Sequence, residues 1–216
     1  MLRRTNYGEA DRILQLITPT GRRAVMARGV RKEKSKLAGG VELFAVSDVV
    51  LGKGKGDLNI LTSARLVVFY RNILSSYERM EFGYEVLKQV ARASEMVDEP
   101  EWYEVIDEVL AALDDLTVDI RLIRTWFYIR HSSLLGHELG LRLDIDGQKI
   151  EEGDVYVYDV AERGLRRAET GDIGSDNIKL LRVTSVKSLH IVRQIGGIGD
   201  VIVTCERVAR AHAALD

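Results

Sequence analysis

The stretch RILQLITPTGRRAVMARGVRKEKSKLAGG, residues 12–40, decides what kind of fold the chain begins with. An apolar run at residues 13–17 stops at Thr-Pro-Thr-Gly, residues 18–21, which is a turn signal. A second apolar run starts at Ala24 and leads into Gly29. Two strands joined by a tight turn are therefore predicted, with a strongly basic connection after the second strand.

The chain continues with strand-like sequence up to residue 70. Residues 43–51 are rich in Val and Phe, and three closely spaced glycines follow them. Residues 58–61 and 64–70 are predicted to form a fourth and a fifth strand. Five short strands with glycine-rich turns favour a small barrel over a sandwich.

The pattern becomes helical after Leu74. Apolar residues recur at helical spacing from residue 77 to 91, and Pro100 suits the start of a second helix. Asp119 can cap a third helix, which ends near Gly136. Residues 141–172 contain a predicted β-hairpin, followed by helices at about 177–194 and 201–215. We therefore predict an α+β chain with two domains, a small β-barrel at 1–73 and a helical domain with an inserted hairpin at 74–216.

Composition restricts the class of protein. The 216 residues are 46 % hydrophobic and 30 % charged, as in ordinary globular proteins. No apolar run approaches the roughly 20 residues of a membrane span, and no secretory signal is visible, so we expect a cytoplasmic protein. Cys205 is the only cysteine, which excludes a disulfide framework.

The net charge of −2 conceals an asymmetry between the two parts. Residues 1–80 hold 15 Lys and Arg against 7 Asp and Glu, a net charge of +8, and the remainder carries −10. Nucleic-acid backbones are dense lines of negative charge, so we predict that the basic part binds nucleic acid. The alternative is a solvated loop whose charge only aids solubility. The candidate nucleic-acid-binding residues are Arg22, Arg23, Arg28, Arg31, Lys32, Lys34, Lys36, Lys53 and Lys55.

The candidate residues form one patch only if both ends of the second strand share a face. Phe44 and Phe69 are predicted to lie in the core, which leaves no obvious row of stacking aromatics. Binding to the nucleic-acid backbone is therefore more plausible than base recognition. The segment GKGKGD, residues 52–57, does not match a phosphate-binding loop and is predicted to be a hairpin turn.

Nothing in the sequence assembles an active site. The histidines are scattered, and Cys205 is predicted to be a small core residue. The acids of the second helix are predicted to form its solvated face; they are Asp107, Glu108, Asp114 and Asp115. No pair of nucleophile and base can be formed, so we expect neither an enzyme nor a cofactor or metal. A metabolic enzyme with a basic pocket is disfavoured for the same reason.

The N-terminal sequence resembles the RecO family of DNA repair and recombination proteins. The resemblance rests on LRRTNYGEADRI, residues 2–13, followed by ARGVRKEKSKLAG, residues 27–39. It implies an N-terminal OB barrel and a helical C-terminal domain. It also implies a non-catalytic, nucleoid-associated recombination mediator that binds single- and double-stranded DNA and anneals complementary strands. The implied partners are RecR, the acidic tail of the single-stranded-DNA-binding protein and, indirectly, a RecA-type recombinase. An RNA- or ribosome-associated OB adaptor is the alternative, because charge alone does not separate DNA from RNA.

The chain departs from the family pattern in two places. Many members carry a four-cysteine zinc module where residues 141–172 lie, and this chain has no cysteine there, so we expect a hairpin without zinc. The resemblance also begins at residue 2, where family members usually have several more residues. We therefore expect a short first barrel strand or a start further upstream.

The third helix offers a candidate site for the acidic tail. Arg121, Arg124 and Arg130 lie among apolar residues of this helix. Arginine can pair bidentately with a carboxylate while its neighbours bury an apolar side chain. In the other interpretation, these arginines pair with acids of their own domain at Asp114, Asp115 or Asp119.

Overall fold

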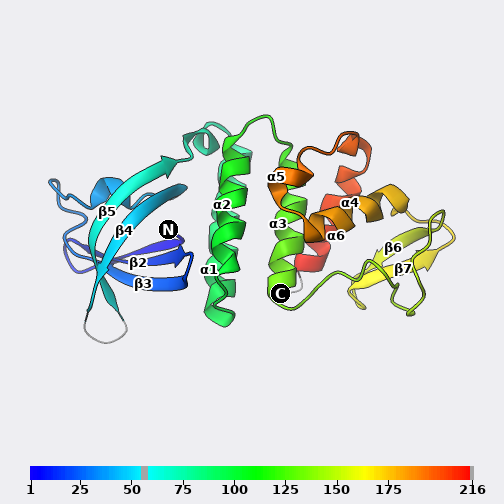
Figure 1. Cartoon of the computed structure of the whole chain (residues 1–216), viewed down its shortest axis with the longest axis horizontal. Coiled ribbons are helices and arrows are strands. Elements are labelled where there is room, and N and C mark those ends of the chain that lie inside the picture. The colour runs from blue at the N-terminus through cyan, green and yellow to red at the C-terminus, as the bar shows by residue number, and fades with distance from the viewer. Residues whose placement is uncertain (55–57, 215–216) are drawn as a thin grey trace. The chain divides into compact units, whose positions relative to one another are not determined.

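The computed structural model describes residues 1–54 and 58–214. The predicted α+β class is confirmed: a five-stranded sheet comes first, helices follow, and a separate hairpin lies between helices (Figure 1). The chain divides into two compact units, Met1–Asp115 and Leu116–Asp216. The predicted boundary at 73/74 separates the sheet from the first α-helix, but two helices pack with the sheet in the first unit.

The sheet has the order β1-β2-β3-β5-β4. Neighbouring strands run antiparallel, except that β3 and β5 are parallel. This is the predicted OB-type arrangement, and among the described residues no pairing joins β1 to β4. The strands are β1 Arg3–Tyr7, β2 Asp11–Thr18, β3 Gly21–Ala27, β4 Ala45–Gly52 and β5 Asn59–Phe69.

Two of the predicted strands are corrected. Residues 58–61 and 64–70 are not separate strands, because β5 continues through them beside β4, with irregularities at Val46/Ser47 and Val50/Leu51. The strand β1 was not among the five strands predicted from the apolar pattern, although the resemblance implied a short first strand or a start further upstream. All five of its residues are exposed, so RRTNY lacks the apolar alternation that marks a half-buried strand.

The core of the sheet follows the alternation of β2 and β3. Leu14, Leu16 and Val25 are buried in one cluster with Ala27, Val30, Val41 and Leu61. Phe44 is also buried, and its ring lies 5.0 Å from that of Tyr84. The prediction for Phe69 was wrong: its side chain is 40 % exposed at the end of β5.

Two helices complete the first unit. The helix α1, Tyr77–Met96, begins at Ser76, whose side chain accepts a hydrogen bond from Arg79 N. The helix α2, Glu101–Asp114, starts after Pro100, as predicted. A short 3-10 helix, η2 Arg71–Ser75, connects the sheet to α1.

The acids of α2 are only partly a solvated face. The carboxylate of Asp107 accepts a hydrogen bond from the Tyr70 hydroxyl at 3.1 Å, and Asp114 accepts one from Asn72 N at 2.7 Å. Burial and the neighbouring Asp107 carboxylate raise the pKa of Tyr70 above its usual value. These contacts hold the segment after β5 against α2.

The described part of the second unit contains the α-helices α3 to α6 and the hairpin. Asp119 caps α3 by accepting a hydrogen bond from Arg121 N, as predicted. The predicted helix at 177–194 is split at Lys187 and Ser188 into α4 and α5. The elements are α3 Ile120–Leu134, β6 Val155–Asp159, β7 Gly164–Ala168, α4 Ser175–Val186, α5 Leu189–Val192 and α6 Ile202–Ala213. Short 3-10 turns lie at η1 Ala38–Gly40 and η3 Ile198–Asp200.

Packing and backbone hydrogen bonds hold the hairpin. Tyr156, Leu165 and Ile173 are fully buried. Tyr156 and Ile173 exchange backbone hydrogen bonds of 2.9 and 3.1 Å. In the described part of the chain, no group of three His, Cys, Asp or Glu side chains is placed to hold a metal ion.

Candidate nucleic-acid interface

The basic loop, residues 28–36, leaves the end of β3 and carries five exposed cations. They are Arg28, Arg31, Lys32, Lys34 and Lys36. Backbone hydrogen bonds shape the segment into turns, from Lys32 N to Gly29 O at 3.1 Å and from Ser35 N to Lys32 O at 3.0 Å. Gly29 has φ +61°, a left-handed conformation that favours glycine. The side chains therefore point outward from a structured segment.

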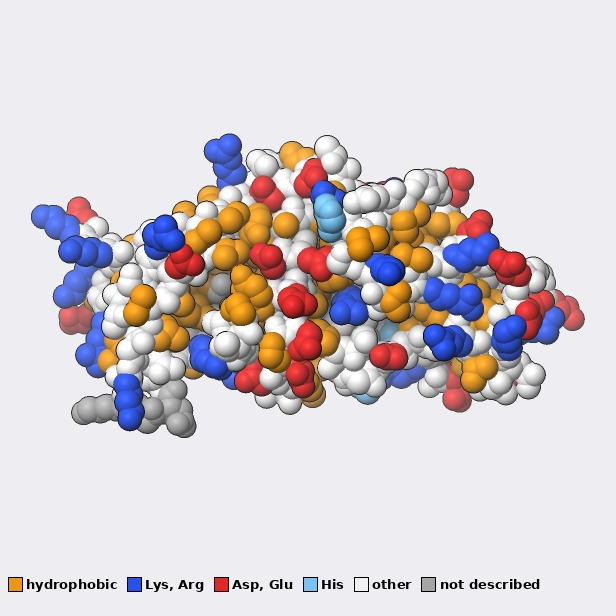
Figure 2. Space-filling view, in the orientation of Figure 1, with side chains coloured by type: hydrophobic (Ala, Val, Ile, Leu, Met, Phe, Trp, Pro, Cys, Tyr) orange, Lys and Arg blue, Asp and Glu red, His pale blue; other side chains and the backbone are white. Residues whose placement is uncertain are grey.

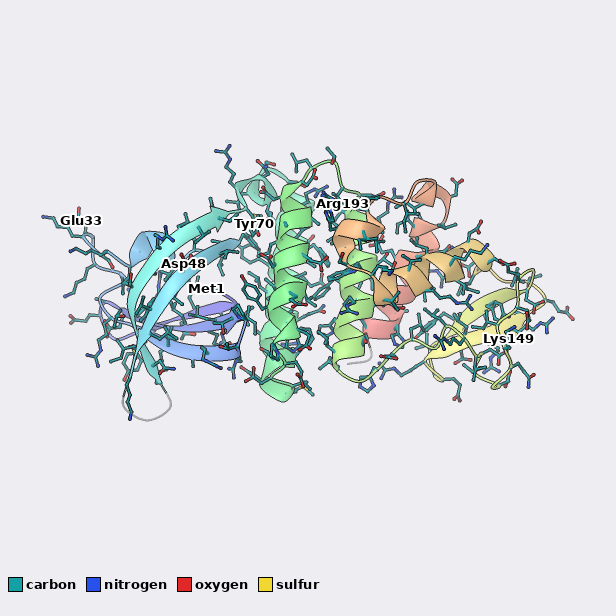
Figure 3. All side chains as sticks on the ribbon, in the orientation of Figure 1. Met1, Glu33, Asp48, Tyr70, Lys149 and Arg193 are labelled. Atoms are coloured by element: carbon teal, nitrogen blue, oxygen red, sulfur yellow. The ribbon has the colours of Figure 1, made fainter. Side chains whose placement is uncertain are left out.

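The base of this loop is fixed to the sheet. The Asp11 carboxylate accepts a hydrogen bond from Gly29 N at 2.7 Å, and Ala10 O accepts one from Arg31 N at 2.9 Å. Val30 is buried in the sheet core. Figure 3 shows Glu33 at the outer end of the loop, pointing into solvent, and Figure 2 shows Lys and Arg side chains gathered at the same edge. The anchored base presents these charges on one side of the first unit.

Arg22 and Arg23 do not belong to this cluster. They lie at the start of β3, about 13–17 Å from its other end at roughly 3.3 Å per residue. Arg22 forms an ion pair with Glu95 of α1 at 2.9 Å, and its backbone N donates to Asp98 at 2.7 Å. Arg23 donates to the carbonyl oxygens of Thr20 and Arg22 at 2.8 and 2.7 Å. Both side chains are half-buried and help to fasten the sheet.

The other candidate cations, and two arginines that were not among the candidates, are more dispersed. Lys53 is exposed after β4, and Lys55 lies outside the described residues. Exposed Arg3 and Arg4 on β1 were not among the predicted site residues. They stand in the quoted motif LRRTNYGEADRI, but the strand that presents them was not predicted from the apolar pattern.

The three arginines of α3 have partners within the second unit. Arg121 pairs with Asp119 at 2.6 Å, and Arg124 pairs with Glu206 of α6 at 3.4 Å. Arg130 donates to Ser185 O at 3.0 Å, and its guanidinium lies 5.9 Å from the centre of the Trp126 ring. A partner's carboxylate would therefore join or replace existing contacts. Their role in partner binding stays a prediction.

The other residues considered for chemistry are structural. Cys205 is fully buried, as predicted, and burial raises the pKa of its thiol to about 11. His131 and His212 are buried. His212 bonds to the Tyr158 hydroxyl at 2.9 Å through Nδ1 and to His137 O at 2.8 Å through Nε2. Because Nε2 must donate to the carbonyl, neutral His212 accepts from Tyr158 and joins α6 to the hairpin.

The fold and this surface define a class of protein. The chain is an α+β protein in which an OB-type sheet carries an anchored basic loop and a helical unit follows. Among the described helices, none combines the length and apolar character that crossing a membrane requires.

Comparison with known proteins shows which family the chain is similar to. Residues 1–70 match the family described as "Recombination protein O N terminal". The chain is 34 % identical over 144 residues to the DNA repair protein RecO of Dehalococcoides mccartyi strain 195, an alignment that covers 66 % of this chain and 56 % of that protein. It is 38 % identical over 98 residues to RecO of Roseiflexus sp. strain RS-1, covering 45 % and 32 %. It is 26 % identical over 220 residues to RecO of Dehalococcoides mccartyi strain CBDB1, covering 98 % and 86 %.

Residues 1–70 thus match the RecO N-terminal family, and the chain as a whole is similar to DNA repair proteins named RecO. It spans little more than half the length of the first of these relatives and about a third of the second. The family match over residues 1–70 includes both LRRTNYGEADRI and the basic loop. It confirms the resemblance that these two segments indicated.

Proposed function

We propose that this protein is a DNA-binding recombination mediator. The observation that carries the proposal is the basic loop: five exposed cations within nine residues, on a base that is hydrogen-bonded to the β1–β2 turn. Each cation that meets a phosphate releases condensed counterions, which supplies affinity without sequence readout. Because the base of the loop is already ordered, less conformational entropy is lost when the charges engage a strand.

Backbone binding suits a protein that anneals strands. Cations that hold phosphates leave the base edges free to pair, and they reduce the repulsion between two approaching polyanions. The loop contains no aromatic side chain, so base stacking within it does not compete with pairing. The proposed activity is therefore binding of single- and double-stranded DNA, annealing of complementary strands and assistance to recombinase loading, without catalysis.

The proposed protein partners follow from the similarity to RecO proteins. They are RecR, the single-stranded-DNA-binding protein and, indirectly, a RecA-type recombinase. For the acidic tail of the single-stranded-DNA-binding protein we propose α3 as the site, through Arg124 and Arg130. Both guanidinium groups already contact oxygen acceptors of the second unit, so a carboxylate would compete with Glu206 and Ser185 O.

Annealing of coated strands tests the proposal. Complementary oligonucleotides coated with single-stranded-DNA-binding protein should anneal faster when the protein is added. A variant with Arg31, Lys32, Lys34 and Lys36 replaced by Ala should lose most of this acceleration. The matched control replaces four exposed cations elsewhere in the first unit, Arg65, Arg71, Lys88 and Arg92, and changes the net charge equally.

Three outcomes would contradict parts of the proposal. Equal annealing with and without the parent protein would contradict the mediator function. Equal loss in both variants would mean that net charge, and not the basic loop, determines binding. Selective binding of RNA over DNA of the same sequence would favour an RNA-associated adaptor.

A further inference from the structure

Tyr7 is an exposed aromatic side chain that the fold does not use for its core. It ends β1, whose five residues are all exposed, and 56 % of its surface is accessible. The other aromatic residues before α1 are Phe44 and Tyr70, which are buried, and Phe69, at the far end of β5. An aromatic ring in this position contributes little to stability, because little of its apolar surface leaves water on folding.

The basic loop is held against the turn that follows Tyr7. Tyr7 is paired with Asp11 across the β1–β2 ladder, and the Asp11 carboxylate accepts the hydrogen bond from Gly29 N at 2.7 Å. Arg31 donates from its backbone N to Ala10 O at 2.9 Å and from its side chain to Gly8 O at 3.4 Å. Gly8, the residue next to Tyr7, has φ +54° and turns the chain back toward β2. An exposed ring therefore lies beside the base of the cationic loop.

We propose that Tyr7 stacks on an unpaired base of a strand whose phosphates the basic loop holds. This inference rests on the proposed function, since it needs a nucleic acid on the loop. Cationic grooves with neighbouring aromatic rings are the usual arrangement in sequence-tolerant binding of single strands. In a duplex the bases are stacked on one another and offer no free face. Tyr7 thus distinguishes single strands from duplexes, whereas the cations bind both.

The test compares three variants on two forms of DNA. Tyr7→Ala should weaken binding of a thymidine oligonucleotide by about 5- to 100-fold, the range for loss of one stacked base. Tyr7→Phe keeps the ring and should bind within about twofold of the parent. Duplex binding should be unchanged in both variants. Tyr77→Ala is the matched control, since Tyr77 is a 74 % exposed tyrosine on α1 of the same unit.

A modified strand makes the test specific for stacking. An oligonucleotide with abasic sites keeps its phosphates but has no base to stack, so the parent and Tyr7→Ala should bind it equally. A strand containing 5-iodouracil should crosslink to Tyr7 on irradiation, with the adduct located by mass spectrometry. Circular dichroism and thermal melting check that each variant is folded.

The outcomes separate the inference from the proposed function. If charge replacement in the basic loop abolishes binding while Tyr7→Ala binds single strands like the parent, stacking is refuted and the interface stands. If Tyr7→Ala loses duplex and single-strand binding equally, Tyr7 supports the loop and does not stack. If the parent protein binds no DNA, both are overturned.

Discussion

Arg79 of α1 is a buried cation whose removal should destabilise the first unit. Its side chain is among the buried polar groups, at 8 % exposure. Its Nη1 atom lies 3.3 Å from Ala112 O, 3.0 Å from Leu113 O and 3.2 Å from Asp115 O. These carbonyl groups lie at the end of α2, where a helix has acceptors without helical partners. Arg79 therefore caps α2 from the neighbouring helix.

The size of the effect follows from this geometry. One nitrogen carries two hydrogens, so the three contacts amount to about two charge-assisted bonds, at roughly 1.5–3 kcal/mol each. The cost of removing a guanidinium group from water offsets part of this gain. We expect Arg79→Met, which keeps the apolar stem, to lower the free energy of unfolding by about 2–4 kcal/mol. At a slope of roughly 2 kcal/mol per molar urea, the midpoint should fall by about 1–2 M.

The assay must report on the first unit alone. Hydrogen exchange of peptides from α1 and α2, measured across a urea series, does so. Arg92→Met is the matched control, because Arg92 is an exposed arginine of the same helix, and it should change stability by less than about 0.5 kcal/mol. A loss below about 1 kcal/mol for Arg79→Met would refute the capping role.

Three further predictions concern chemistry and partners. Purified protein should contain no stoichiometric zinc, since structural zinc needs about four Cys or His ligands and residues 141–172 contain neither residue type; one zinc per chain by elemental analysis would contradict this. Arg124→Ala and Arg130→Ala should weaken binding of the acidic tail peptide while DNA binding stays intact, and unchanged peptide titrations for both would place the site elsewhere. The pKa of the Cys205 thiol is raised from 9.0 to about 11, so the thiol should resist alkylation at pH 8 until urea unfolds the chain. Because the unfolded thiol ionises first, this group should lower stability only as the pH rises above about 9, and rapid labelling of the folded protein at pH 8 would show that Cys205 is accessible.

Most of the helices could be predicted from local signals in the sequence. Asp119 and Pro100 marked helix starts, because capping and N-terminal proline act within one turn. The break after α4 was missed. Apolar residues continue at helical spacing on both sides of Lys187 and Ser188. The helix nevertheless ends there, because the backbone of Lys187 is extended, with φ −104° and ψ 153°, and its carbonyl oxygen accepts a hydrogen bond from Trp126 Nε1 at 2.8 Å.

Two strands could not be predicted correctly from the alternation of apolar and polar residues. A half-buried strand such as β2 alternates apolar and polar residues, whereas β1 at the sheet edge is exposed on both faces and has no such pattern. The continuous β5 was read as two strands because Thr62 and Ser63 interrupt its apolar residues. Pairing with β4 maintains the strand through them.

The candidate site was predictable where it is local in sequence and not where it depends on distant contacts. The five cations at 28–36 stand together in sequence and remain together in the structure. Arg22 was assigned to the same patch, but its partner Glu95 is 73 residues away, and only the fold brings them together. Tyr7 was not predicted to be a site residue, because only the β1–β2 turn brings it close to Arg31.

The salt dependence of DNA binding tests the central claim most directly. Each phosphate contact contributes roughly one unit to the slope of log affinity against log salt concentration. Replacing Arg31, Lys32, Lys34 and Lys36 with Ala should therefore reduce the slope by up to about four units, equally for unrelated sequences. The control variant at Arg65, Arg71, Lys88 and Arg92 should keep the slope of the parent. An unchanged slope in the basic-loop variant would contradict the account, because the loop would then be a solvated surface with no contact to DNA.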